Sequence, residues 1–251
     1  MTTQLLIYKT AVPVSAARHG DCFVEAGADF SFSGAVNSVP LMAVEFPSAA
    51  VEYPIVFAGA EGEILPAAIL GLRGNENLFL SGASAWEGRY VPAFLRRYPF
   101  VFSQEGELFT LCVDEEFPGL NRAGRGEALF DGSGAPTAYV EGLLAFLQDF
   151  QAQSIRTQAF CARLKALNLL EPTQANVTES SGAQLSLGGF MAVSRERLRV
   201  LPDGTLAELV RGDEMELLML HLGSLRNFEG LKDRLAAHSA ATLGVSAGLI
   251  H

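Results

Sequence analysis

The hydrophobic pattern of this chain is built around one phrase that occurs twice, at residues 47–57 and 92–102. Each copy consists of a proline, six residues of which the last is tyrosine, and then Pro-x-Val-Phe. The first proline favours the first turn of a helix, and the second disfavours helix at the tyrosine before it. The β-branched and aromatic residues that follow favour a buried strand. Each copy therefore predicts a short helix that turns sharply into a strand.

The similarity between the two copies continues beyond these strands. A Glu-Gly-Glu turn and then a further apolar strand follow each copy, the strands at residues 64–72 and 108–113. We interpret this pattern as a degenerate internal duplication of helix, strand, turn and strand, over about 46–90 and 91–140. The alternative, that one local chemistry suits two unrelated helix–strand junctions, stays open.

The second half of the chain is predicted to be largely helical. Residues 137–167 carry two apolar faces at helical spacing. Three further helices are predicted in the C-terminal quarter, with Ser194, Asp203 and Asp213 as their capping residues. The weakly patterned tail from residue 236 is expected to be frayed or docked.

The remaining segments predict strands and irregular structure. We expect irregular strands and loops over 1–40, a polar linker or exposed loop over 173–182, and a strand pair or ribbon over 184–193. Together the elements predict an α+β protein with a mixed sheet built from two helix–strand–turn–strand units and a helical C-terminal section. We expect an α+β core at 1–172 and a ribbon with helices at 173–251, packed as one compact unit.

Composition and charge exclude several classes of protein. The 251 residues are 49% hydrophobic and 18% charged, which is typical of a globular chain with a sizeable core. A net charge of −10 without clustered Lys and Arg argues against a nucleic-acid partner. The longest apolar-rich runs, such as 215–222, are far shorter than the roughly 20 residues of a transmembrane helix. We therefore expect neither a nucleic-acid partner nor a transmembrane segment.

The N-terminus and the cysteines bear on compartment and cofactors. No basic leader precedes the first short apolar stretch, which predicts a cytoplasmic protein without a cleaved signal peptide; secretion or surface association without such a signal is the alternative. Cys22, Cys112 and Cys161 are far apart and lack metal-ligand spacing, so we expect reduced, mostly buried thiols and no metal site. No complete phosphate-loop or dinucleotide motif occurs, and we expect no cofactor.

The sharpest candidates for a binding site lie in the second short helix and in the segment just before it. They are Trp86, Arg89, Arg96 and Arg97. A guanidinium group binds carboxylate or phosphate with two hydrogen bonds, and an aromatic neighbour adds stacking. Arg89 and Arg96 would share a helix face if the helix extended across Pro92. The alternative is that one arginine pairs internally with Asp114 or Glu115 while the other is solvated.

Asp114 and Glu115 are candidates for acid–base chemistry, because they follow a predicted strand. Paired carboxylates catalyse proton transfer when their environments separate their pKa values. Carboxylates at strand ends are more often solvated or paired with arginine. His221 lies within an apolar helix, where a core or interface histidine with satisfied hydrogen bonds is expected. No nucleophile motif lies beside this histidine in the sequence. The sequence thus favours a binding protein over an enzyme.

One series of motifs extends over nearly the whole chain. It consists of Glu45-Phe46, Tyr53–Phe57, Tyr90–Phe102 with its Arg-Arg-Tyr-Pro-Phe core, Cys112–Glu115 and His221–Asn227. In these motifs the chain resembles the bacterial SapC-like family, whose name comes from a surface-layer-associated protein. The resemblance implies an accessory role and no particular reaction. A permease label used for some members is contradicted here, because a permease needs several apolar spans.

We therefore predict a non-enzymatic binding or accessory protein that recognises a protein, a peptide or a small anionic ligand through the segment from Trp86 to Arg97. The first alternative is a small-molecule enzyme that uses Asp114 and Glu115 with Arg96 or Arg97. The second is a surface-layer or assembly component. A homo-oligomer is compatible with all three.

Overall fold

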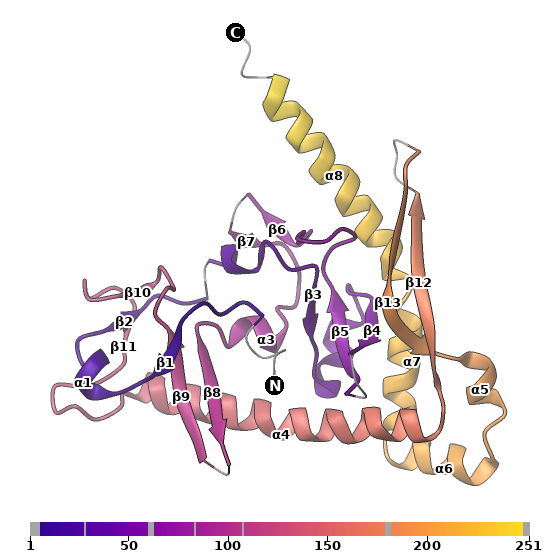
Figure 1. The fold of residues 1–251 in the computed structure, drawn as a ribbon, viewed down its shortest axis with the longest axis horizontal. Coiled ribbons are helices and arrows are strands. Elements are labelled where there is room, and N and C mark those ends of the chain that lie inside the picture. The colour runs from indigo at the N-terminus through magenta and orange to yellow at the C-terminus, as the bar shows by residue number, and fades with distance from the viewer. Residues whose placement is uncertain are drawn as a thin grey trace.

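In the computed structural model, small antiparallel sheets lie along one long helix, and a second long helix projects away from them (Figure 1). The structure describes residues 6–27, 29–59, 63–82, 84–106, 108–178 and 182–247, with side chains as far as residue 240. The α+β class and the helical C-terminal section are confirmed. Among the helices described, none combines the length and the apolar character that crossing a bilayer requires.

The first copy of the repeated phrase forms the predicted helix–strand junction. Helix α2 (Phe46–Ala49) ends before Pro54 and leads into the buried strand β4 (Ile55–Ala58). Strand β4 pairs antiparallel with β5 (Leu65–Ile69), which completes the order helix, strand, strand. The turn predicted between these strands falls mainly outside the described residues.

The second copy repeats this arrangement. Helix α3 (Ala93–Arg96) begins after Pro92 and leads into β8 (Phe100–Glu105), which pairs antiparallel with β9 (Leu108–Asp114). The two copies differ at the second proline, since the peptide bond between Tyr98 and Pro99 is cis and its counterpart in the first copy is not.

The two units lie in separate antiparallel sheets, which differs from the single mixed sheet that the sequence predicts. One sheet has the order β12-β13-β4-β5-β3, and the other has the order β1-β9-β8. The physical reason is that each hairpin leaves an edge to be paired, and a different segment of the chain pairs with each. The added strands are β1 (Ala11–Pro13), β3 (Ser38–Pro40), β12 (Leu170–Thr178) and β13 (Gln184–Val193).

Strand β12 corrects the prediction of a linker or loop over 173–182. Residues up to Thr178 pair with β13 across a bulge between Thr173 and Ala175, and 179–181 lie outside the described residues. Ala175 and Val177 are less exposed than the polar residues between and beside them. With so few apolar positions, the period-two pattern of a half-exposed strand is not visible in the sequence.

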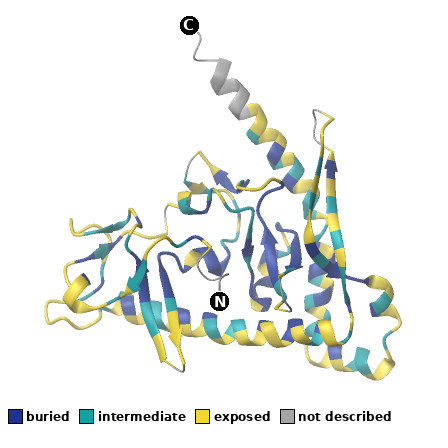
Figure 2. Cartoon of the chain, viewed as in Figure 1, coloured by how far each residue is buried: buried dark blue, intermediate teal, exposed yellow. Residues whose placement is uncertain are grey.

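Helix α4 (Ala138–Ala166) runs along the sheets, and its buried positions recur along its length (Figures 1 and 2). Its buried residues are Val140, Leu147, Phe150, Thr157, Phe160, Cys161 and Leu164. The hydroxyl oxygen of Thr157 accepts the amide of Ala43 at 2.9 Å, which holds the turn before α2 against the helix. Cys22, Cys112 and Cys161 are free thiols and all three are buried.

The C-terminal section contains the three predicted helices and a fourth. The left-handed residue between the second and third is Asp213, with φ of 60°, and Gly212 before it has φ of −93°. The fourth helix continues to Ala247 and so includes much of the tail that was expected to be frayed or docked. The four helices are α5 (Arg195–Arg199), α6 (Asp203–Arg211), α7 (Glu214–Ser224) and α8 (Asn227–Ala247).

Shorter elements complete the part of the chain that the structure describes. They are α1 (Ala16–His19), β2 (Phe23–Val24), η2 (Ser31–Ser33), η3 (Ala43–Glu45), β6 (Leu80–Ser81), β7 (Ala85–Trp86), β10 (Leu120–Asn121) and β11 (Glu127–Ala128).

His221 ties helix α7 to the first repeat unit. Its side chain is fully buried, and Nδ1 donates to the carbonyl oxygen of Ile55 at 2.8 Å. Its Nε2 accepts the amide N–H of Val193 at 3.0 Å, so the ring is held as the neutral tautomer with the proton on Nδ1. Ser224 adds a second tie, because its hydroxyl oxygen accepts the amide of Ile55 at 2.9 Å. His221 is therefore a satisfied core histidine.

Acidification is expected to destabilise the fold through His221. Burial lowers its pKa to about 4 from the ordinary 6.5, so the unfolded chain binds the proton more tightly. The contribution of the neutral ring is fully present above pH 6.5 and is lost as the pH falls toward 4. Linkage gives a loss of about 2 kcal/mol between pH 8 and pH 5. Urea unfolding at both pH values, with His221→Gln for comparison, measures it; equal losses in both proteins would contradict this assignment.

Candidate functional site

Arg97 is buried among aromatic rings and has a structural role. Its side chain is 3% exposed, and its guanidinium carbon lies 4.4 Å from the ring centre of Phe94, 4.8 Å from that of Phe150 and 5.7 Å from that of Tyr8. Burial lowers the pKa of Arg97, and the aromatic faces stabilise the cation by cation–π attraction. This environment leaves the group inaccessible to a ligand.

Arg96, in contrast, is exposed at the end of α3. Its Nε donates to the carbonyl oxygen of Val91 at 3.0 Å, and Nη2 lies 3.4 Å from the hydroxyl oxygen of Tyr90. Burial raises the pKa of Tyr90 to about 12, so this phenol is neutral at physiological pH. No carboxylate of the described residues lies within 4.0 Å of the Arg96 guanidinium. Arg96 therefore keeps most of its five N–H donors for another partner.

A pocket of about 340 Å³ opens beside Arg96, and most of its lining is apolar or aromatic. The ring of Phe32 stacks on Tyr98 with centres 4.0 Å apart, and Phe117 meets Tyr98 edge-on at 5.3 Å. These contacts hold the walls in place. The lining residues are Gly27, Asp29, Phe30, Phe32, Val91, Leu95, Arg96, Tyr98 and Phe117. A mostly apolar pocket with a few polar groups is the usual form of a small-ligand site.

Trp86 and Arg89 are near this pocket in sequence but are not part of its lining. The indole ring of Trp86 stacks on the ring of Phe79 with centres 5.8 Å apart. It lies tilted against the ring of Phe30 with centres 5.6 Å apart, so it supports the pocket wall that Phe30 forms. The side chain of Arg89 is exposed, while its amide donates to the Glu52 carboxylate. Because α3 begins only after Pro92, Arg89 and Arg96 do not share the helix face that the sequence allowed.

Asp114 is fully buried and saturated with hydrogen bonds. Oδ1 accepts the amides of Thr10 at 3.0 Å and Glu116 at 3.2 Å, and Oδ2 accepts the amide of Lys9 at 2.9 Å and the hydroxyl of Tyr98 at 3.2 Å. The carboxylate thus ties the N-terminal segment to the second repeat unit.

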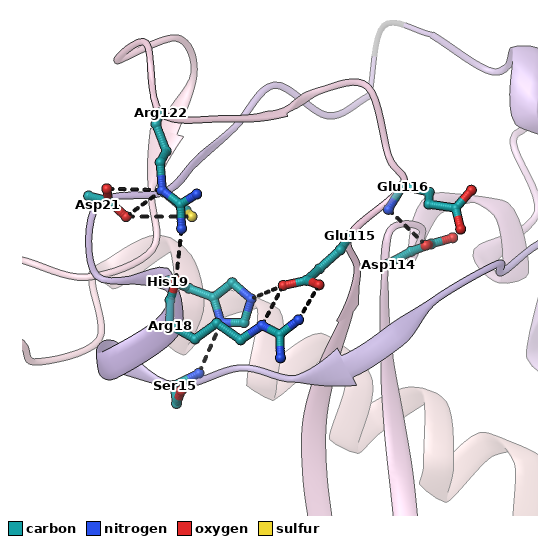
Figure 3. A network of polar contacts seen from close by, with 9 residues as sticks. Ser15, Arg18, His19, Asp21, Asp114, Glu115, Glu116 and Arg122 are labelled. Carbon is teal, nitrogen blue, oxygen red and sulfur yellow. Dashed lines mark hydrogen bonds and ion pairs between the residues drawn. The ribbon is translucent and has the colours of Figure 1, made fainter.

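Glu115 points into a different network, formed with helix α1 (Figure 3). Its Oε1 accepts Arg18 Nε at 2.6 Å and lies 3.2 Å from Nε2 of His19. The amide of Ser15 donates to His19 Nδ1 at 3.2 Å, which places the ring proton on Nε2. The hydrogen bond with Arg18 holds the pKa of Glu115 below its ordinary value. Asp114 and Glu115 therefore do not share a proton-transfer site.

The neighbouring thiol and acids do not form an activated group. Burial raises the pKa of Cys22, and both nitrogens of His19 already have partners, so this pair lacks the thiolate of a nucleophilic cysteine. Arg122 Nε contacts both carboxylate oxygens of Asp21, at 2.8 and 2.9 Å (Figure 3). Within the described residues, no group of three or more His, Cys, Asp or Glu side chains could hold a metal ion.

The sequence indicates Arg96 as a binding residue but does not indicate the aromatic walls of its pocket. Phe30 and Phe32 come from an irregular segment rich in Gly and Ser, and Phe117 follows the second repeat unit. The spaced pair Phe-Ser-Phe in an otherwise polar stretch was the available signal. This short segment shows no helical or strand periodicity from which the residues that pack against Phe30 and Phe32 could be inferred.

A larger hollow of about 780 Å³ lies between residues 63–64 and helix α4. Its helical side is lined by Gln158, Cys161, Ala162, Lys165 and Ala166, and burial raises the pKa of the Cys161 thiol to about 12. None of the described residues that line it is aromatic. We favour the smaller pocket as a ligand site, because there a guanidinium group meets an apolar cavity.

Comparison with known proteins gives one positive result. A protein-family model described as SapC matches residues 14–231, which include both repeat units, the pocket beside Arg96 and helix α7. The searches of curated proteins and of solved structures found no match.

Proposed function

The chain belongs to the SapC family, and we propose that it is a binding protein whose pocket beside Arg96 takes a small carboxylate with an aromatic body. One observation carries this proposal. The exposed guanidinium group of Arg96, which has no carboxylate of the described residues within 4.0 Å, borders a cavity whose walls are Phe30, Phe32, Tyr98 and Phe117.

The pocket chemistry supports each half of such a ligand. A flat ring fits among aromatic walls, because offset and edge-on contacts between rings are favourable beyond the area that they bury. A carboxylate suits Arg96, because charge-assisted bonds to a guanidinium are the stronger class of hydrogen bond. The other charged lining residue, Asp29, already accepts the amide of Ser31 at 2.7 Å. The cavity volume is at the lower end of the range for small-molecule sites.

The positions of the acidic residues favour binding over catalysis. Asp114 is enclosed by four donors, and Glu115 is paired with Arg18 and His19. Neither residue lines the pocket. Neither Asp114 nor Glu115 is therefore in a position to act as general acid or base on the proposed ligand.

Titration with phenylacetate tests the proposal. For a ligand of this size we expect a dissociation constant of about 0.1–1 mM. Arg96→Ala is expected to weaken binding about tenfold or more, because it removes the charged donor. Arg89→Ala is the matched control, an exposed arginine outside the pocket, and should leave binding unchanged. Calorimetry or ligand-observed NMR gives the constants.

Further ligands define which carboxylate the pocket takes. Phenethylamine and benzyl alcohol keep the ring without the carboxylate and should bind more weakly than phenylacetate. The dipeptide N-acetyl-Ala-Phe, with a free or an amidated C-terminus, distinguishes a peptide end from a free acid. Absence of phenylacetate binding, or equal binding by the Arg96→Ala variant, would refute the proposal.

A further inference from the structure

Helix α7 has an exposed apolar stripe on the side that faces α2. Met219, Leu220 and Gly223 lie on one face, because they are spaced by one, three and four residues. Met219 is 45% exposed, and Val51 beyond the end of α2 is 59% exposed. Together they border a hollow of about 440 Å³. The opposite face of α7 packs into the core through Leu218, His221 and Leu222.

Two opposite charges bound this stripe. Glu216 lies near the start of α7 and Arg226 lies in the turn after it, and both line the same hollow. Neither has an ion pair within the described part of the chain. At 1.5 Å per residue they are about 15 Å apart along the helix axis. The middle of this span falls at residue 221, which is also midway between Met219 and Gly223.

We propose that this face binds the same face of a second copy of the chain, as a two-fold symmetric dimer with the two α7 helices antiparallel. A two-fold axis at the level of residue 221 places Glu216 of each copy opposite Arg226 of the other. It also places Met219 of each copy opposite Gly223 of the other.

The space over Gly223 suits such a contact. Apart from the adjoining backbone of its own helix, a Cβ atom at this position would meet no heavy atom within 4 Å, so the surface there is open to an incoming side chain. In a two-fold interface each contact occurs twice, so one methionine and one glycine supply two complementary contacts. The Glu216–Arg226 ion pair also occurs twice, and these two pairs fix the antiparallel direction of the α7 helices.

Charge complementarity is what favours a second copy as the occupant. The net charge of −10 opposes self-association over long distances. At an ionic strength of about 0.15 M this repulsion is screened beyond about 8 Å, while contacting ion pairs at a desolvated surface are screened less. The face supplies both signs at positions that match under two-fold symmetry, so a second copy would pair both charges.

Charge reversal tests the arrangement. Sedimentation velocity of the full chain at about 0.15 M salt, over micromolar to submillimolar concentration, is expected to show a monomer–dimer equilibrium. Glu216→Arg and Arg226→Glu should each weaken it about tenfold or more, because each change turns both ion pairs into like-charge contacts. An equimolar mixture of the two variants should dimerise again, since opposite charges then face each other.

An apolar surface variant provides the matched control. Met219→Glu is expected to weaken dimerisation to a similar extent, while Val200→Glu, at an 81% exposed valine outside the hollow, should not change it. Circular dichroism and thermal unfolding confirm that the variants are folded. A wild-type chain that stays monomeric throughout, a dimer indifferent to charge reversal, or a mixture that fails to dimerise would each overturn the proposal.

Discussion

Replacement of Asp114 by asparagine is expected to lower the free energy of unfolding by about 3 kcal/mol. The two carboxylate oxygens together accept three amides and the hydroxyl of Tyr98 in a fully buried position. Asparagine has one oxygen acceptor, and its NH₂ group would face two donors in place of the second oxygen. Two donors that face this buried carboxylate then lose their partner, and hydrogen bonds to a charged group are each of the stronger kind.

Glu116→Gln is the control for this change. Glu116 is an exposed carboxylate two residues away, and it accepts the hydroxyl of Thr10 at 2.7 Å. Because water replaces a lost partner there, we expect a change within about 0.5 kcal/mol. Urea unfolding of both variants measures the difference. If the two variants lost similar free energies of unfolding, burial of Asp114 would not determine its contribution to stability.

The helix–strand junctions could be predicted because their chemistry is local. Proline acts on its own φ and on the residue before it, and these effects do not depend on the rest of the fold. Pro54 and Pro99 therefore mark the same junction in both units. The sheets could not be predicted in this way, because the strands that join β4 and β9 come from the C-terminal ribbon and the N-terminal segment.

The candidate site was predictable only in part for the same reason. The sequence distinguishes Arg96 and Arg97 as arginines next to aromatic residues, but their opposite burial depends on Tyr8 and Phe150, which lie far away along the chain. The position of Asp114 at the end of a strand predicts a site carboxylate. Its partners in the N-terminal segment carry no signal in the sequence, because they are backbone amides.

Corresponding positions of the two copies line two different hollows. Ala50 and Val51 of the first copy correspond to Leu95 and Arg96 of the second. The first pair borders the hollow beside α7, and the second pair borders the aromatic pocket. The internal duplication stays a prediction. If the two units do share an origin, the difference between Val51 and Arg96 at corresponding positions separates the proposed apolar docking surface of the first copy from the proposed anion site of the second.

Removal of the Glu45 carboxylate, by Glu45→Ala, is expected to lower the free energy of unfolding by about 3 kcal/mol. The carboxylate is 5% exposed and joins the two repeat units. It accepts the amide of Met42 at 2.8 Å beside its own helix, and the amide of Ala93 at 2.7 Å and the hydroxyl of Tyr90 at 2.8 Å from the start of the second unit. Alanine would leave the two buried amides and the hydroxyl of the half-buried Tyr90 without this partner.

Two further variants separate this role from a general effect of charge. Glu45→Gln keeps Oε1 for Ala93 and Tyr90 and loses only the Met42 bond, so we expect an intermediate loss of about 1–2 kcal/mol. Glu52→Ala removes a half-exposed carboxylate that bonds the amides of Arg89 and Tyr90, and about 1 kcal/mol is expected, because water can reach those donors.

The single tryptophan, Trp86, reports unfolding of all three variants, because its ring stacks on Phe79 in the folded chain. A larger loss for Glu45→Ala than for Glu45→Gln, and the smallest loss for Glu52→Ala, follows if buried donors determine the cost. Equal losses in the two Glu45 variants would show that the negative charge, and not the number of satisfied donors, holds the start of α3. In that case the link between the units would be electrostatic, and added salt would weaken it.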